Sequence, residues 1–257
     1  MVLLSFDIEE FDMPLEYNKE ISFEDQMEIS IRGTNHILDI LEKHQIKATF
    51  FSTVIFAQNA PEVIKRLLDS KHELASHGYF HSSFDNTHLA LSRKVLQAIS
   101  SQDIIGFRMP RMKPVDENEV RKAGYLYNSS INPTWIPGRY NNLSRPRTIF
   151  ETAGIWQIPA SVSPILRFPL FWLSFHNLPL AIYVWLSKIT HKKDGYLNIY
   201  FHPWEFTDLN DKERFGFPGY VSKNSGTKMI ERMDKFIAVL KKKNYTFGTL
   251  SEFININ

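Results

Sequence analysis

His77 and His81 lie four residues apart beside a glycine, a spacing that lets two imidazoles bind one metal ion. An acidic segment, Asp7-Ile8-Glu9-Glu10, lies upstream, and Arg108 and His202 lie downstream. Taken singly, each of these groups is more often structural than functional. Together they supply the ligands, the base and the acid that metal-dependent hydrolysis requires. The sequence therefore indicates the metal site of a hydrolase.

Strand-like and helical patterns alternate along the chain. In the predicted helix at 23–44, apolar Ile29, Ile37, Leu38 and Leu41 recur at helical spacings. We expect strands at Val2–Asp7, Lys47–Thr53, His72–Ser76, Ile104–Arg108, Tyr125–Tyr127 and Tyr196–Phe201, and helices at Phe23–His44, Glu62–Leu68, Glu117–Ala123 and Gly226–Lys243.

This alternation predicts an α/β fold with a parallel sheet, either closed as a barrel or open and doubly wound. Each segment with chemical side chains follows a predicted strand. A barrel gathers such segments at the carboxyl ends of its strands, whereas an open sheet gathers only those near its switch point. We therefore expect a TIM-barrel-like fold, in a single domain over residues 1–257.

Composition excludes other classes of function. The chain has 257 residues, 43% of them hydrophobic, which is ample for a large core. Lysine and arginine outnumber acidic residues by 30 to 28, so charge gives no reason to expect nucleic acid as a partner. Because there is no cysteine, zinc would have to be held by histidine and carboxylate.

The N-terminus runs from a short apolar stretch into acidic residues and lacks the basic and long apolar regions of a secretory signal. If the chain is the whole gene product, we expect a cytoplasmic enzyme.

Residues 168–187 carry no formal charge and are rich in large apolar side chains. Their length approaches a membrane span, but Pro169, His176, Asn177 and Pro179 interrupt them. We expect a buried helix pair or a lid over the site. The alternative is an apolar surface for a lipid-linked substrate, a membrane or a partner subunit, which would make the enzyme membrane-associated.

Five segments resemble, in this order, the motifs of the polysaccharide deacetylases, which share the NodB homology domain of carbohydrate esterase family 4. They are Ser5-Phe6-Asp7, Ser76-His77-Gly78-Tyr79-Phe80-His81, Gly106-Phe107-Arg108-Met109-Pro110, Tyr127-Asn128-Ser129-Ser130 and Tyr200-Phe201-His202-Pro203-Trp204-Glu205. An ordered set is far more specific than any one motif. The resemblance implies a distorted, incomplete (β/α) barrel of about seven parallel strands. It also implies metal-dependent removal of acetyl groups from N-acetylated sugars.

By similarity, Asp7 would accept a proton from water and His202 would protonate the departing amine. Arg108 would orient Asp7 and keep it ionised. Glu9, His77 and His81 would bind one divalent ion, zinc first, with cobalt, nickel and iron as alternatives.

Three further residues would contact the substrate. The backbone N–H of Arg111 falls where the family has an oxyanion donor. Tyr79 and Trp204 would stack on sugar faces, although aromatic residues beside a site are as often its wall.

Two positions depart from the commonest family pattern. That pattern has adjacent aspartates, whereas this chain has Asp7-Ile8-Glu9. Residues two apart on a strand face the same side, so Glu9 can join Asp7, with Glu10 and Asp12 as other candidate ligands. Asn128 stands where family members often carry aspartate. The negative charge that would tune His202 is therefore missing at this position.

The predicted function is hydrolysis of the N-acetyl amide of an amino sugar in a polysaccharide or its precursor. One alternative is an amidohydrolase acting on a small non-carbohydrate amide. Another is a carbohydrate-binding pseudoenzyme that kept the fold without the metal.

Overall fold

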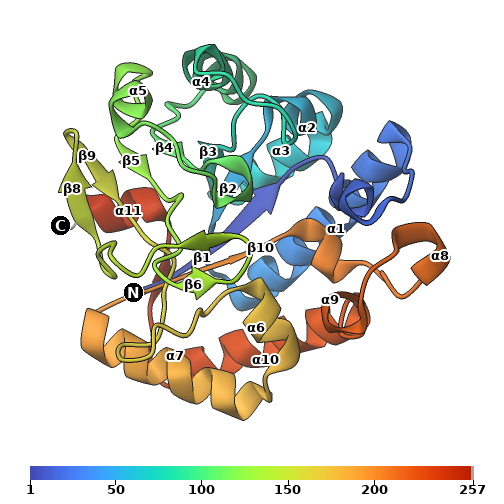
Figure 1. Cartoon of the computed structure of the whole chain (residues 1–257), viewed down its shortest axis with the longest axis vertical. Coiled ribbons are helices and arrows are strands. Elements are labelled where there is room, and N and C mark those ends of the chain that lie inside the picture. The colour runs from blue at the N-terminus through green and yellow to red at the C-terminus, as the bar shows by residue number, and fades with distance from the viewer. Residues whose placement is uncertain (256–257) are drawn as a thin grey trace.

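The computed structural model describes residues 1–255, in which most strands form one curled sheet surrounded by helices (Figure 1). The main path of the sheet runs β10 (Leu197–Phe201), β1 (Val2–Ile8), β2 (Thr49–Ser52), β3 (Glu73–Ser76), β4 (Gly106–Phe107), β5 (Tyr127–Asn128), β9 (Ile155–Gln157) and β8 (Phe150–Thr152). Each neighbouring pair from β10 to β9 is parallel, and only β8 pairs antiparallel, with β9. The predicted incomplete barrel is confirmed.

The gap between the two ends of the sheet is bridged by loop contacts. The backbone N–H of Ser161, which follows β9, donates to the carbonyl of Asn198 in β10 at 2.8 Å. The N–H of Asn198 donates in return to the Ser161 hydroxyl at 2.9 Å. β11 (Phe247–Gly248) adds a short parallel strand beside the start of β1. The barrel is thus closed by loops and not by a continuous ladder.

Helices surround the sheet, and the last of them packs against Leu3 and Phe51 inside the barrel. They are α1 (Phe23–His44), α2 (Val54–Asn59), α3 (Pro61–Asp69), α4 (Thr87–Ser100), α5 (Glu117–Lys122), α6 (Trp172–Asn177), α7 (Leu180–Asp194), α8 (Lys212–Phe215), α9 (Gly219–Ser222), α10 (Thr227–Lys241) and α11 (Leu250–Ile254). The bounds of α1 are those predicted, because Ser22 caps its first turn and Gln45, at a φ of 52°, ends it. The strands predicted at 104–108 and 125–127 are shorter or shifted, which affects only their ends.

β1 is buried on both faces, and the alternation of its side chains separates two environments. Leu4, Phe6 and Ile8 belong to the cluster that packs against the helices. Leu3 belongs to a cluster inside the barrel, with Phe51 among its members. Asp7, two pleats along from Leu3, therefore faces the barrel interior.

Residues 168–187 form neither a single helix nor a membrane span. α6 ends before Pro179 and α7 starts after it. Phe175 and Tyr183 are buried in the core, as a buried helix pair requires. Among residues 1–255, no helix has both the length and the hydropathy to cross a membrane.

Two of the connecting segments matter for the site. The hairpin of β6 (Trp135–Ile136) and β7 (Tyr140–Asn141) extends from the loop after β5. A short 3₁₀ helix, η3 (Pro203–Phe206), follows β10 and contacts α1.

Gly33 of α1 allows this close contact. A Cβ atom there would lie 1.9 Å from the carbonyl oxygen of Pro203, closer than two such atoms can approach. Since Pro203 directly follows His202, the fit of α1 against η3 fixes the position of a predicted catalytic residue.

We expect Gly33→Ala to lower the free energy of unfolding by at least about 2 kcal/mol, because the new methyl group forces the two backbones apart. Urea denaturation measures this change. Gly219→Ala is the matched control, since no atom lies within 4 Å of the Cβ it would add. Equal stability of the two variants would contradict the assigned contact.

Candidate metal and catalytic site

The end of β1 places two carboxylates in the barrel. Asp7 is the last residue but one of the strand and Glu9 follows it, so both point to the same side. Both are almost fully buried, at 3% and 4% exposure. Glu10 points elsewhere and accepts a hydrogen bond from the Thr53 hydroxyl at 2.5 Å.

His77 and His81 lie in the loop after β3, where Gly78 adopts a φ of 85° that other residues rarely reach. The Nδ1 atom of His77 donates to the carbonyl of Arg108 at 2.9 Å, and that of His81 donates to Asp12 at 2.7 Å. These bonds leave the Nε2 atom of each ring as the lone-pair nitrogen.

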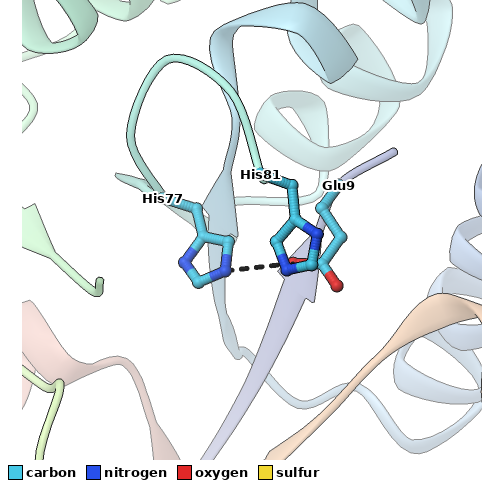
Figure 2. A group of neighbouring side chains, drawn as sticks. All are labelled: Glu9, His77 and His81. Atoms are coloured by element: carbon cyan, nitrogen blue, oxygen red, sulfur yellow. Dashed lines mark ion pairs between the residues drawn. The ribbon is translucent and has the colours of Figure 1, made fainter. Parts of the chain in front are cut away.

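Both Nε2 atoms face Glu9 (Figure 2). The Oε2 atom of Glu9 lies 3.0 Å from the Nε2 atom of His77 and 3.2 Å from the Nε2 atom of His81. One ligand atom from each residue can be chosen so that all three lie within 4.8 Å of one another. Asp12 holds the far side of the His81 ring and so serves as an outer partner.

The chemistry of these three residues fits a divalent cation. The Oε2 atom of Glu9 is buried and accepts no hydrogen bond. Burial raises the pKa of Glu9 to about 7 and lowers that of His77 to about 4 in the absence of an ion. Three candidate ligand atoms therefore converge at one buried point, and a carboxylate with two imidazoles is a common zinc set.

Asp7 is held by a buried arginine. Arg108 donates to its Oδ1 atom at 2.6 Å and is itself fully buried. The Arg108 guanidinium also donates to the carbonyl and hydroxyl of Ser129. Burial alone would raise the pKa of Asp7, but the charges of Arg108, His77 and His202 outweigh it and lower that pKa. Asp7 is therefore an ionised carboxylate, as a base must be.

His202 lies on the other side of Asp7, with its Nε2 atom 4.0 Å from the Asp7 Oδ2 atom. Its backbone N–H and its Nδ1 atom both contact Oε1 of Glu205, at 2.6 and 3.0 Å. The Nε2 atom is thus the nitrogen left to face the cleft. Burial lowers the pKa of His202, but the hydrogen bond and charge of Glu205, with Glu9 and Asp7, raise it overall.

Glu205 has a second partner. Its Oε2 atom accepts a hydrogen bond from Nε2 of His176 on α6 at 2.9 Å, and both side chains are completely buried. Our sequence analysis missed both roles. The three-residue spacing of His202 and Glu205 is that of a capping box, a signal that could have found Glu205. His176 gave no such signal.

Asn128 does not take the place of the expected aspartate beside His202. It donates to Oε1 of Gln157 at 3.1 Å and accepts a hydrogen bond from the Ser130 hydroxyl. The orientation of His202 therefore comes from its own turn.

These groups open into a cavity of about 320 Å³. Of the predicted residues, the cavity is lined by Asp7, Glu9, His77, His81, Arg111, His202 and Trp204. Arg108 stands behind Asp7. Tyr79 is absent from the lining, and its ring contacts those of Phe80 and His88 instead.

Aromatic side chains form much of the wall. Trp204 stacks on His202 with ring centroids 4.8 Å apart. Trp172 and Leu173 of α6 line the cavity, so part of the segment 168–187 does cover the site. Tyr140 of β7, together with Phe171 and Tyr200, completes an apolar wall that sequence analysis did not predict.

A family model described as polysaccharide deacetylase matches residues 20–127. The peptidoglycan-N-acetylmuramic acid deacetylase PdaA of Bacillus subtilis is 29% identical over 102 residues, which are 36% of this chain and 39% of that protein. A chitooligosaccharide deacetylase of Bradyrhizobium is 40% identical over 48 residues, which are 19% of this chain and 22% of that protein. The alignments thus span well under half of these curated relatives.

Solved structures agree on the fold. A putative polysaccharide deacetylase from Mycobacterium smegmatis superposes with a TM-score of 0.67 at 19% identity, covering 98% of this chain and 87% of that one. Puue allantoinase gives 0.64 at 16% identity, covering 98% and 87%. BA3943 of Bacillus anthracis, a pseudoenzyme of carbohydrate esterase family 4, gives 0.53 at 15% identity, covering 98% and 64%. Residues 20–127 thus match the polysaccharide deacetylase family, in agreement with the motifs, and the whole chain shares the fold of these solved structures.

We expect the wild-type protein to bind one equivalent of Zn²⁺ and Glu9→Gln to bind it far more weakly. The loss should exceed the roughly 10–100-fold that removal of an outer hydrogen-bond partner costs. Isothermal titration after chelation measures both affinities. Glu10→Gln is the neighbouring control, because Glu10 contacts Thr53 instead. The ligand assignment would be wrong if Glu10→Gln, and not Glu9→Gln, weakened binding.

Proposed function

We propose that this protein is a metal-dependent deacetylase that hydrolyses the N-acetyl amide of an amino sugar in a polysaccharide or its precursor. The observation that carries the proposal is the convergence of three groups on one cavity. These are the candidate ligand atoms of Glu9, His77 and His81, the carboxylate of Asp7, and the imidazole of His202. The family match supports the reaction class.

Glu9, His77 and His81 would hold the ion, with zinc the best fit to their donor atoms. When bound, a divalent ion supplies a positive charge that polarises the amide carbonyl and favours ionisation of water.

Asp7 and His202 would divide the proton transfers. Asp7, kept ionised by Arg108, accepts the proton of the water whose oxygen attacks the carbonyl carbon. His202, protonated at Nε2, gives a proton to the amine nitrogen as the carbon–nitrogen bond breaks. The products are acetate and the free amino sugar; Asp7 then releases its proton to solvent, and His202 regains one from solvent.

The cavity wall suits a sugar ring. Trp204 and Tyr200 present flat apolar surfaces, and the Asp7, Glu9 and His202 groups lie together on the same cavity. Arg111 also lines the cavity, where its side chain contacts Asp12 and Glu16.

A small non-carbohydrate amide is the second candidate substrate, favoured by the modest cavity volume of about 320 Å³. A purely binding role is disfavoured by two contacts. Glu9 reaches both histidines despite its spacing from Asp7, and Glu205 supplies the carboxylate that Asn128 lacks.

We expect chelated protein to release acetate from N-acetylglucosamine oligomers only after Zn²⁺ or Co²⁺ is added. Asp7→Asn should reduce kcat by about 10²–10⁴-fold while Zn²⁺ still binds, because only the base is removed. His77→Ala should lose both binding and activity. Zn²⁺-loaded wild type that releases acetate from a small acetamide and not from any sugar would favour the second candidate.

Glu205 should act as a positioning residue. Because its charge raises the pKa of His202, Glu205→Gln should lower that pKa and move the alkaline limb of the kcat profile to lower pH. The acid must be protonated to act, so activity above neutral pH falls most. We expect kcat to drop about 10–100-fold with KM nearly unchanged.

Glu252→Gln is the matched control for this variant, since Glu252 occupies the equivalent capping-box position with Thr249 in α11. Its pH profile should be that of wild type. A Glu205→Gln profile that keeps its alkaline limb in place would contradict the role of Glu205 in positioning His202.

A further inference from the structure

The outward face of α7 is apolar. Ile182, Trp185 and Ile189 are 46%, 59% and 39% exposed, and their spacing of three and four places them on one side of the helix. On the other side, Tyr183 and Val184 are buried in the core. A helix at the surface of a globular protein normally turns polar residues to solvent, so this face is exceptional.

A loop before α6 presents the most exposed apolar side chains among residues 1–255. Ile165 is 91% exposed and Leu166 is 85% exposed. A bridge between Val162 and Pro169 closes the base of the loop, and the N–H of Ser163 donates to the Phe168 carbonyl at 2.8 Å. The two side chains therefore project from a structured turn.

Arg147 connects the loop to α7. Its guanidinium donates to the carbonyl of Val162, at the base of the loop, and forms an ion pair with Asp194 at the end of the helix. Figure 1 shows α7 on the outside of the molecule, beside α10. We call Ile165, Leu166, Ile182, Trp185 and Ile189 the apolar surface.

The charges next to this surface are positive. Lys188, Lys192 and Lys193 lie on α7, and none of them has an ion-pair partner among the salt bridges of the described chain. Asp194 is the only acidic residue of the helix, and Arg147 neutralises it. The face therefore combines exposed apolar groups with uncompensated lysines.

We infer that the apolar surface docks on an anionic lipid bilayer. Tryptophan and isoleucine side chains enter the interface of a bilayer, while lysines reach its anionic headgroups. Between this loop and α7 in the sequence lies α6, whose Trp172 and Leu173 line the candidate catalytic cavity. The inference stands apart from the chemistry of that cavity, which it does not require.

A second copy of the chain fits this surface less well. In a two-fold contact the patch would meet itself, so the three lysines of one α7 would approach those of the other. Few side chains take part, whereas a stable interface buries about 800 Å² on each partner. A bilayer with negative headgroups meets neither difficulty.

Co-sedimentation with vesicles tests the inference. Wild-type protein should pellet with vesicles of equal parts phosphatidylglycerol and phosphatidylcholine, and bind pure phosphatidylcholine much more weakly. The double variant Ile182→Ser/Trp185→Ser, and separately Ile165→Ser/Leu166→Ser, should each reduce partitioning by about tenfold or more. Replacing the three lysines by glutamine should remove the preference for phosphatidylglycerol.

Leu91→Ser is the matched control, because Leu91 is 44% exposed on α4, outside the apolar surface. It should bind vesicles as wild type does, and thermal unfolding should show all variants folded. Wild type that stays in the supernatant with both vesicles would overturn the inference. So would a wild-type dimer, seen by light scattering, that the α7 double variant converts to monomers without any binding to lipid.

Discussion

Asp7 is an anion buried inside the barrel, and the rest of the site is arranged around its compensation. A lone carboxylate there would cost several kcal/mol, so it requires a cation of good geometry. Arg108 supplies this cation, with a donor nitrogen 2.6 Å from the carboxylate. Its other donors bind Ser129, and its Cζ atom lies 4.1 Å from the centroid of the Phe51 ring. One ion pair thus ties the end of β1 to the ends of β4 and β5 across the barrel.

Glu9, two residues further on, has no such arginine. It faces imidazole nitrogens whose protons have already been directed away, toward Arg108 and Asp12. The two carboxylates of one strand end therefore have pKa values shifted in opposite directions, lowered for Asp7 and raised to about 7 for Glu9. Such divergence usually accompanies different roles, and it agrees with the proposed roles of base for Asp7 and ligand for Glu9.

Much of this arrangement could be predicted from sequence, because alternation on a strand is a strong local rule. It placed Glu9 beside Asp7, and the helical spacing of apolar residues likewise predicted α1 with its observed bounds. Tyr79 could not be placed, since the turn at Gly78 directs the residues of that loop by tertiary contacts with no sequence signal. The antiparallel β8 likewise depends on packing, and the pairing of His176 with Glu205 joins residues 29 positions apart. The break between α6 and α7, in contrast, is marked in the sequence by Pro179.

Because position 128 carries asparagine and not aspartate, His202, the proposed acid, is held in another way. With a carboxylate at position 128 in β5, the orientation of His202 would depend on where that separate strand is placed in the sheet. With Glu205 it depends on a single turn, η3, whose capping geometry joins the acid and its partner within four residues. That turn is in close contact with α1, where Gly33 leaves room for only a hydrogen against Pro203. His176 then fixes the far side of Glu205 from α6, whose neighbouring Trp172 lines the cavity. The packing of η3 against α6 therefore sets both the orientation of His202 and the shape of the cleft. A change in α6 would alter both.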